Sequence, residues 1–224
     1  MSAKNVVLVH GAWADGTGWR GVYDALVVRG FKVSIAQIPL TSFADDVAAT
    51  RRVLARQDGP TVLVGHSYGG AVISEAGNSD TVAALVYVAA FMPDAGESLG
   101  KLTEGGGPPP VQPSADGFLF FDSAIMPAAF AGDLPPADGA FVAASQVPIA
   151  AAIFATPVTT PAWKTKPVWQ VVSKDDRIIP PEAQRAWGAR AGATAVEVAG
   201  SHVVFMSQPA AVADVIEAAA KGAS

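Results

Sequence analysis

The stretch that most constrains the fold is TVLVGHSYGGAVISEA, residues 61–76. Its first four residues are typical of a strand buried on both faces, and its last six begin a helix. Between them lies a G-x-S-x-G pattern, Gly65 to Gly69, with Ser67 at its centre. At such a junction the turn is so tight that side chains two residues from the serine would collide. The pattern predicts a strained turn that raises the Ser67 hydroxyl above the sheet edge, in front of a helix N-terminus.

Strand and helix patterns alternate on both sides of this turn. Strands are predicted at residues 5–10, 31–38, 61–66, 82–91, 167–173 and 194–200, and helices at 19–29, 42–59, from 71, 181–192 and 208–222. Gly30 is placed to end the first helix, Ser42 to cap the second, and Pro181 suits the first turn of a later one. The alternation predicts an α/β fold with a mostly parallel six-stranded sheet and helices on both faces.

The alternation stops between residues 93 and 166. This segment is rich in Pro, Gly and Ala, and its low-complexity part EGGGPPPVQP, residues 104–113, is incompatible with a helix or a central strand. Long connections without strands are usually lids or binding loops. We therefore predict a core domain of residues 1–92 and 167–224, with residues 93–166 inserted as a cap that lacks regular helices. Mobility is expected at residues 105–110.

Composition excludes several functions. Of 224 residues, 50% are hydrophobic and 16% charged, the net charge is −5, and no Lys/Arg cluster occurs, so nucleic acid and anionic membranes are poor partners. The absence of cysteine excludes disulfides, thiolate catalysis and sulfur-ligated metals. No apolar run reaches the roughly 20 residues of a membrane span, and the start lacks a secretory signal. We expect a globular cytoplasmic protein that is a monomer or a homodimer.

A serine hydroxyl is a weak nucleophile without a base, and in this architecture the acid and then the histidine follow the serine along the chain. Of the three histidines, only His202 follows Ser67, because His10 and His66 precede it. The acid should lie at the end of a strand, where both Asp175 and Asp176 follow the fifth predicted strand. The residues alone leave the choice between these two open.

An acyl-transfer site also needs backbone N–H donors for the oxyanion. We expect these from Tyr68, which follows the serine, and from Ala12 in the loop after the first strand. Trp19 in the same loop is assigned to the core. The substrate pocket is predicted to be lined by six residues: Gly11, Trp13, Phe91, Met92, Val203 and Phe205. No metal and no organic cofactor is required.

Four motifs, LVHGAW, GHSYGG, DRIIPPE and GSH, occur in this order and resemble the α/β-hydrolase superfamily over nearly the whole chain. More narrowly, the chain resembles the small esterases related to plant methyl-ester hydrolases and hydroxynitrile lyases, and their bacterial homologues. It looks like the compact form that lacks the superfamily's first two strands. The resemblance implies Ser67 as nucleophile, Asp176 as acid and His202 as base. It also implies the amides of Ala12 and Tyr68 as oxyanion donors.

Two departures from the lyases favour ester hydrolysis. Gly11 and Val203 occupy the positions at which the hydroxynitrile lyases carry threonine and lysine. We therefore predict a serine hydrolase that cleaves small or medium neutral carboxylic esters through an acyl-enzyme on Ser67. Two alternatives stay open. One is another chemistry on the same fold, as a carbon–carbon hydrolase, lyase or perhydrolase. The other is a non-catalytic small-molecule binding protein, since the scaffold also serves as a hormone receptor.

Overall fold

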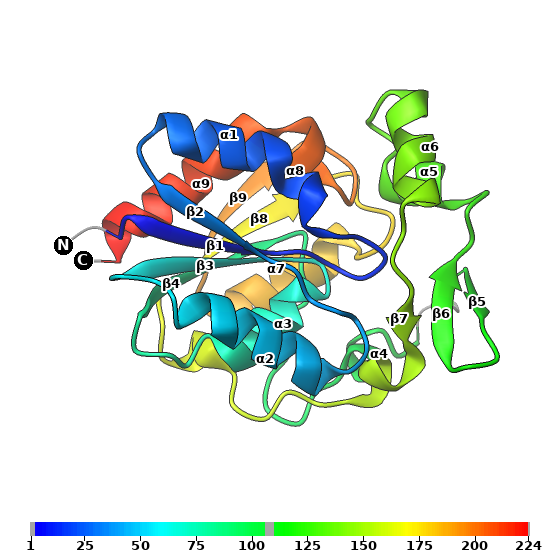
Figure 1. The fold of residues 1–224 in the computed structure, drawn as a ribbon, viewed down its shortest axis with the longest axis horizontal. Helices are drawn as coiled ribbons and strands as arrows, with labels where there is room; N and C mark the ends of the chain where they lie inside the picture. The colour runs from blue at the N-terminus through cyan, green and yellow to red at the C-terminus, as the bar shows by residue number, and fades with distance from the viewer. Residues whose placement is uncertain (1–2, 106–109, 224) are drawn as a thin grey trace.

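A six-stranded sheet forms the centre of the computed structural model, which describes residues 3–105 and 110–223 (Figure 1). The strands are β1 (Asn5–Val9), β2 (Lys32–Ala36), β3 (Thr61–His66), β4 (Val82–Val88), β8 (Val168–Ser173) and β9 (Thr194–Val198). All neighbours pair in parallel, in the order β2-β1-β3-β4-β8-β9. The predicted sheet is confirmed. Its strand order reverses between β1 and β3, and ligands of open α/β sheets bind beyond the carboxyl ends of the strands at such a point.

Helices cover both faces of this sheet, as predicted. Helices α1 (Arg20–Val28) and α9 (Pro209–Gly222) lie together on one face, and α2 (Phe43–Leu54) and α3 (Gly69–Ala76) on the other (Figure 1). Helix α7 (Pro181–Arg190) contacts β8 and β9. Shorter pieces are η1 (Gly16–Trp19) and α8 (Val204–Ser207). Among the described residues, no helix is long and apolar enough to cross a membrane.

Three of the predicted helix ends are confirmed by their local geometry, whereas α2 ends at Leu54 and not at residue 59 as predicted. The Ser42 hydroxyl accepts a hydrogen bond from the Asp45 amide at 3.0 Å and so caps α2. Gly30 follows α1 with φ at +82°, a conformation that glycine adopts without strain. Pro181 lies in the first turn of α7, where no backbone N–H is needed.

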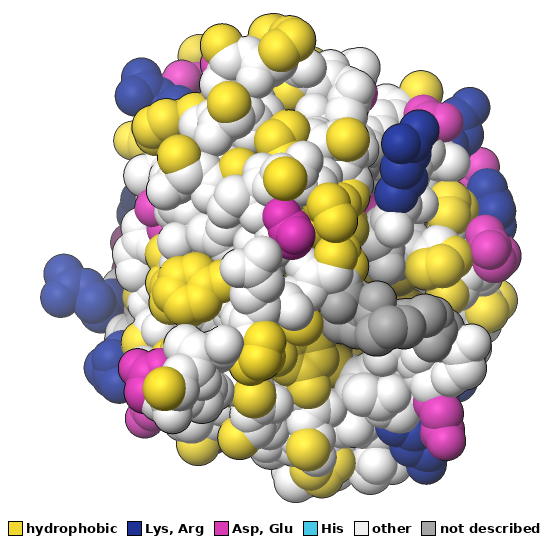
Figure 2. Space-filling model, turned by 90° about the vertical axis from the view of Figure 1, so that its right-hand side faces the viewer, with side chains coloured by type: hydrophobic (Ala, Val, Ile, Leu, Met, Phe, Trp, Pro, Cys, Tyr) yellow, Lys and Arg dark blue, Asp and Glu magenta, His cyan; other side chains and the backbone are white. Residues whose placement is uncertain are grey.

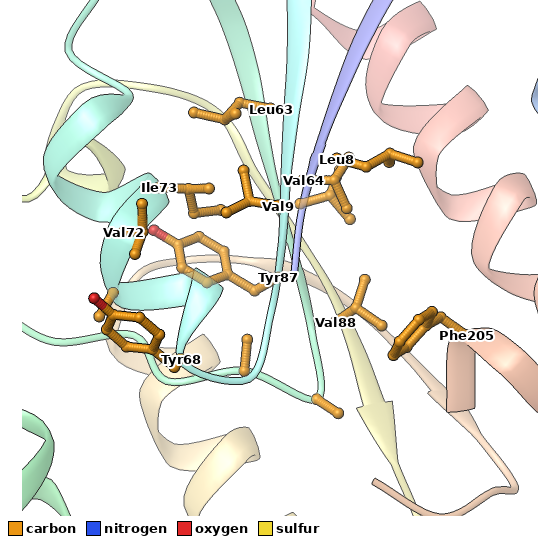
Figure 3. Close-up of a cluster of buried hydrophobic side chains, with 14 of the residues drawn as sticks. Leu8, Val9, Leu63, Val64, Tyr68, Val72, Ile73, Tyr87, Val88 and Phe205 are labelled. Carbon is orange, nitrogen blue, oxygen red and sulfur yellow. The ribbon is translucent and has the colours of Figure 1, made fainter. Parts of the chain in front are cut away.

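The core is packed on both faces of β1, β3 and β4 (Figure 3). Neighbouring residues of a strand point to opposite faces, so Tyr87 lies toward α3 while Val88 lies on the side of Phe205. Every residue of β1 and β3 is buried. Full burial of a Val or Leu side chain contributes about 1.5–3 kcal/mol. These strands are therefore a rigid base for the loops that follow them.

The segment of residues 93–166, called the inserted segment below, leaves the sheet after β4 and returns at β8. It contains a three-stranded antiparallel sheet in the order β5-β6-β7. Its elements are α4 (Leu99–Leu102), β5 (Val111–Pro113), β6 (Phe118–Phe121), α5 (Met126–Phe130), α6 (Pro136–Ala144), β7 (Ile149–Ala150), η2 (Ala151–Ala155) and η3 (Ala162–Lys164). Its small sheet and the helices α5 and α6 lie beyond the carboxyl ends of the main strands, whereas its last residues return beside α3 to the start of β8 (Figure 1).

Two expectations about this segment are wrong. It was expected to contain neither strands nor regular helices, yet it contains both. The strands are two to four residues long and form only by pairing with distant partners, such as Leu119 with Ile149, so they leave little local pattern. The mobility expected at residues 105–110 concerns mainly residues 106–109, which lie outside the described residues.

Two hydrogen bonds join the small sheet to loops of the main body. The indole nitrogen of Trp13 donates to the carbonyl of Leu119 in β6 at 2.9 Å. The amide of Ala150 in β7 donates to the carbonyl of Leu40 at 2.9 Å. The inserted segment is thus attached directly above the loop that follows β1.

Candidate active site

Ser67 lies on a sharp turn between β3 and α3. Its φ is +52°, a left-handed conformation that is uncommon for a residue with a side chain. A Cβ atom at Gly65 would lie 2.5 Å from the Gly69 carbonyl oxygen, and one at Gly69 would lie 2.7 Å from the His10 carbonyl oxygen. Both glycines are therefore required by close backbone approach. The turn holds Ser67 where its side chain is 4% exposed.

His202 lies within hydrogen-bond distance of Ser67. It follows β9, and its Nε2 atom is 2.9 Å from the Ser67 Oγ. Its Nδ1 atom is 2.9 Å from Oδ2 of Asp176. Because the carboxylate accepts from Nδ1–H, Nε2 is the nitrogen that can accept the hydroxyl proton. Residues 135 positions apart in the chain are thus joined in one buried hydrogen-bonded series.

The two candidate acids have different partners. Asp176 contacts the His202 ring, and its Oδ1 atom accepts from the amides of Ile178 and Ile179 at 2.8 and 3.0 Å. Asp175 instead accepts from the amide of Gly200 at 3.1 Å. Asp176 is therefore placed to orient the imidazole, while Asp175 holds the loop that carries it.

Gln184 was not identified from the sequence. Its side chain is fully buried in α7, and its Nε2 atom donates to Oδ2 of Asp176 at 2.9 Å and to the Ile179 carbonyl at 2.8 Å. Its Oε1 atom accepts from the amide of Ser173 at 3.1 Å. Gln184 thereby fixes the Asp176 carboxylate to the end of β8. A glutamine on a helix is common, so the sequence around Gln184 does not indicate its contact with Asp176.

His66 supports the backbone of His202. Its Nε2 atom is 2.9 Å from the His202 carbonyl oxygen, so Nε2 donates and Nδ1 carries the lone pair. Among the described residues, this buried Nδ1 has no hydrogen-bond partner. Burial lowers the pKa of His66 well below its usual value, and the charge of a protonated His202 would lower it further. His66 is therefore neutral and adds no positive charge beside His202.

The loop after β1 lies against Ser67. A Cβ atom at Gly11 would lie 2.8 Å from the Ser67 Cβ. The Nε2 atom of His10 accepts from the Ile38 amide, so Nδ1–H donates to the Gly11 carbonyl at 3.0 Å, and burial lowers the pKa of His10. Within the described residues, the amides of Ala12 and Tyr68 donate no hydrogen bond. Neither amide therefore has an acceptor within the part of the chain that the structure describes.

The Tyr68 side chain is anchored by a buried carboxylate. Its hydroxyl donates to Asp46 at 2.6 Å, and the Leu40 amide donates to the same carboxylate at 2.7 Å. Burial raises the pKa of Asp46 to about 6, although these two donors act to lower it. Burial and the nearby carboxylate raise the pKa of Tyr68. The anchor connects the turn after Ser67 to α2 and to the Leu40 loop.

The residues predicted to line a pocket are all buried but face different neighbours. The Trp13 ring contacts Phe121 and Phe130 of the inserted segment, with centroids 5.3 and 6.1 Å apart. Phe91 stacks on Trp187 at 5.5 Å, while Phe205 lies 4.3 Å from Trp19 and 4.5 Å from His66. Phe205 thus belongs to the core around His66, together with Trp19, which is fully buried as expected. The Met92 carbonyl accepts from the Arg190 guanidinium at 2.7 Å, and the Val203 amide donates to the Phe130 carbonyl at 3.2 Å.

A parallel sheet with a serine on a strained turn, a histidine within hydrogen-bond distance and a carboxylate behind it defines the α/β-hydrolase class. The chain belongs to the alpha/beta hydrolase family, whose model matches residues 6–215. No group of three His, Cys, Asp or Glu side chains that could hold a metal ion occurs in the part of the chain that the structure describes.

Relatives and solved structures agree with this assignment. A carbendazim hydrolyzing esterase of Nocardioides sp. is 36% identical over 125 residues, 48% of this chain and 50% of that protein. The match thus spans half the length of that relative. A pyrethroid hydrolase of Sphingobium faniae JZ-2 superimposes with a TM-score of 0.84 at 24% identity, over 98% of both chains. Polyneuridine aldehyde esterase gives 0.83 at 20% identity, over 96% of this chain and 98% of that one. These neighbours match the predicted esterase group in fold.

Proposed function

We propose that this chain is a serine esterase that cleaves small or medium neutral carboxylic esters. The observation that carries the proposal is the series Ser67 Oγ–His202 Nε2 and His202 Nδ1–Asp176 Oδ2, at 2.9 Å in each step. This arrangement activates a serine for attack on an acyl group. The names of the relatives, an esterase and a hydrolase, support the same class of reaction.

In the proposed reaction His202 Nε2 takes the proton of Ser67 as Oγ attacks the ester carbonyl. Asp176 stabilises the resulting imidazolium. The free amides of Ala12 and Tyr68 donate to the oxyanion of the tetrahedral intermediate. His202 then protonates the departing alcohol, which leaves the acyl group on Ser67. A water molecule, deprotonated by His202, attacks this acyl-enzyme through the same steps and releases the acid.

The charges of the structure favour a neutral substrate. Among the described residues, no Lys or Arg side chain is buried. Arg190 is paired with Glu97, and Lys164 with Asp94. Aromatic rings approach the site instead, since the Phe130 ring lies 4.8 Å from that of His202. An ester with an apolar or aromatic part would bury its surface here without an unpaired charge.

Gly11 argues against lyase chemistry. A side chain at this position would meet the Ser67 Cβ at 2.8 Å and the His66 Nδ1 at 3.0 Å. A threonine, as the lyases carry, would therefore require the loop or Ser67 to shift. The site as built leaves no room for that hydroxyl.

We further propose that residues 93–166 form a cap over a core of residues 1–92 and 167–224. The protein is proposed to act in the cytoplasm, as a monomer or homodimer, without a nucleic-acid or membrane partner. The acidic net charge of −5 supports the last point. Size-exclusion chromatography with light scattering would decide the oligomeric state.

The decisive experiment combines active-site labelling with a substrate panel. A fluorophosphonate probe should label Ser67, located by mass spectrometry, and Ser67→Ala should lose both the label and hydrolysis of p-nitrophenyl esters. Ser145→Ala is the control, because Ser145 is exposed at the end of α6 and bonds to its own helix. A β-diketone and a cyanohydrin test carbon–carbon hydrolase and lyase activity. An unlabelled Ser67, or a Ser67→Ala variant that binds ligand unchanged and loses no turnover, would refute the esterase.

A further inference from the structure

One carbonyl of the inserted segment contacts both chain neighbours of His202. The Phe130 carbonyl accepts from the Ser201 hydroxyl at 2.8 Å and from the Val203 amide at 3.2 Å. Phe130 is the last residue of α5, and the last carbonyls of a helix have no partner within it. Here the loop around His202 provides the partners.

The Phe130 side chain reinforces this contact. It is 1% exposed, and its ring meets the His202 imidazole edge-on at 4.8 Å and 85°. On its other sides it meets Phe121 of β6 at 5.0 Å and Trp13 at 6.1 Å. The position of Phe130 therefore depends on how the inserted segment docks on the loop after β1.

A second group of the inserted segment lies at the same place. Burial acts to raise the pKa of Asp133, but the neighbouring polar groups of Ser201 and Ser207 hold it below its usual value. Asp133 thus lies beside Ser201, whose hydroxyl donates to the Phe130 carbonyl.

The main body holds the same loop from the opposite side. The Ser173 hydroxyl lies 2.6 Å from the carbonyl oxygens of Gly200 and Ser201, and Asp175 accepts from the Gly200 amide. His66 donates to the His202 carbonyl. These bonds do not involve the inserted segment, so the loop would stay folded without it. The imidazole would lose its contact with the Phe130 ring, and its neighbours Ser201 and Val203 would lose their hydrogen bonds to the Phe130 carbonyl.

We propose that docking of the inserted segment positions His202 for proton transfer, with Phe130 and Ser201 as the positioning residues. This inference rests on the proposed esterase function and adds a second role to the segment. Besides covering the site, the inserted segment holds His202 in the position in which it can act as the base. On the face that carries the segment, Figure 2 shows no histidine side chain at the surface, in keeping with the full burial of His202.

The kinetic test uses Ser201→Ala, with Ser145→Ala as the matched serine control in the inserted segment. Positioned acid–base catalysis contributes about 10²–10⁴-fold, so a loosened base should lower kcat about tenfold. KM for a small p-nitrophenyl ester should stay within about twofold, because Ser201 binds no substrate in this scheme. Ser145→Ala should match the wild type. An unchanged kcat in Ser201→Ala would overturn the proposal.

An independent readout is the ring proton that His202 shares with Asp176, observed by proton NMR. Its exchange with solvent should be faster in Ser201→Ala and Phe130→Leu than in the wild type and Ser145→Ala. A loss of kcat without faster exchange would also overturn the proposal, because the base would then be unaffected. If the wild type hydrolyses no ester, the proposed esterase function is wrong. If the ring proton exchanges at the wild-type rate in both variants, the positioning inference is wrong, whatever the activity.

Discussion

At the residue scale, the turn at Ser67 depends on Gly69, which lies against the backbone at the end of β1. In Gly69→Ala the new methyl group would lie 2.7 and 2.8 Å from the His10 and Val9 carbonyl oxygens. These atoms belong to a buried strand and its continuation, so we expect a loss of about 1–3 kcal/mol or more in the free energy of unfolding. Ester hydrolysis should fall with it. Urea unfolding measures the first effect. Gly59→Ala is the control, since its nearest neighbour lies at 3.8 Å, and equal stability of the two variants would contradict the steric explanation.

The adjacent acids Asp175 and Asp176 provide a matched pair of variants. Asp176→Asn removes the charge behind His202 and should lower kcat by about 10⁴-fold, as loss of this charge does in other triads. Asp175→Asn keeps an oxygen for the Gly200 amide and should stay within a few-fold of the wild type. Steady-state kinetics on a p-nitrophenyl ester decides. A larger loss of kcat in Asp175→Asn than in Asp176→Asn would show that Asp175 is the acid and that the assignment to Asp176 is wrong.

Asp46 predicts a pH effect on stability. Its pKa is raised to about 6 by burial, above the ordinary 3.8. A raised pKa means that the folded state binds the proton more tightly, so this group's contribution is full below pH 3.8 and is lost as pH rises through 6. The amount is at most about 3 kcal/mol. In Asp46→Asn this contribution should vanish, so the difference in unfolding free energy between variant and wild type should change between pH 4 and 7. A constant difference would show that Asp46 does not titrate in this range.

At the element scale, the contact between the loop after β1 and β6 can be tested at Trp13. Trp13→Phe keeps a ring but removes the hydrogen bond to Leu119, so the free energy of unfolding should fall by about 0.5–1.5 kcal/mol or more. KM should change as well, because Trp13 is a predicted pocket residue. Trp187→Phe is the control, since the Trp187 contact is ring stacking on Phe91. Denaturant midpoints that shift equally in both variants would argue against a specific role of the bond.

The elements also show how far the sequence could be interpreted. The main strands and helices were predictable because each has a local pattern, such as the Val-rich β1 or the Ser42 cap. The two-residue β7 was not, because it exists through its pairing with β6 and its bond to Leu40. The same holds in the site. Motifs placed Ser67 and His202, but neither Gln184 nor Phe130 has a local signal, because both act through tertiary contacts with distant residues.

At the scale of the whole molecule, the two sheets should differ in stability. Strands β1 and β3 are fully buried, whereas the small sheet has half-buried and exposed positions. Local opening follows such differences in burial and contact. Amide hydrogen exchange should therefore be slowest in β1 and β3 and faster in residues 111–150.

Phosphonylation of Ser67 should slow exchange around Phe130 if the segment docks on the loop of His202. Uniform exchange across both sheets would contradict this division.

The inserted segment departs from β4 and rejoins at β8, which are neighbouring strands paired from Leu85 with Val168 onward. Because these strands are parallel, the segment leaves at the carboxyl end of β4 and must return to the amino end of β8. A replacement must be long enough to cross back along the sheet, and beyond that length a longer loop adds little entropic penalty. Exchange of this one segment, in evolution or by design, could thus change which esters reach Ser67 while the sheet stays the same. The new segment would have to provide a hydrogen-bond acceptor for Ser201 and Val203, as the Phe130 carbonyl does here.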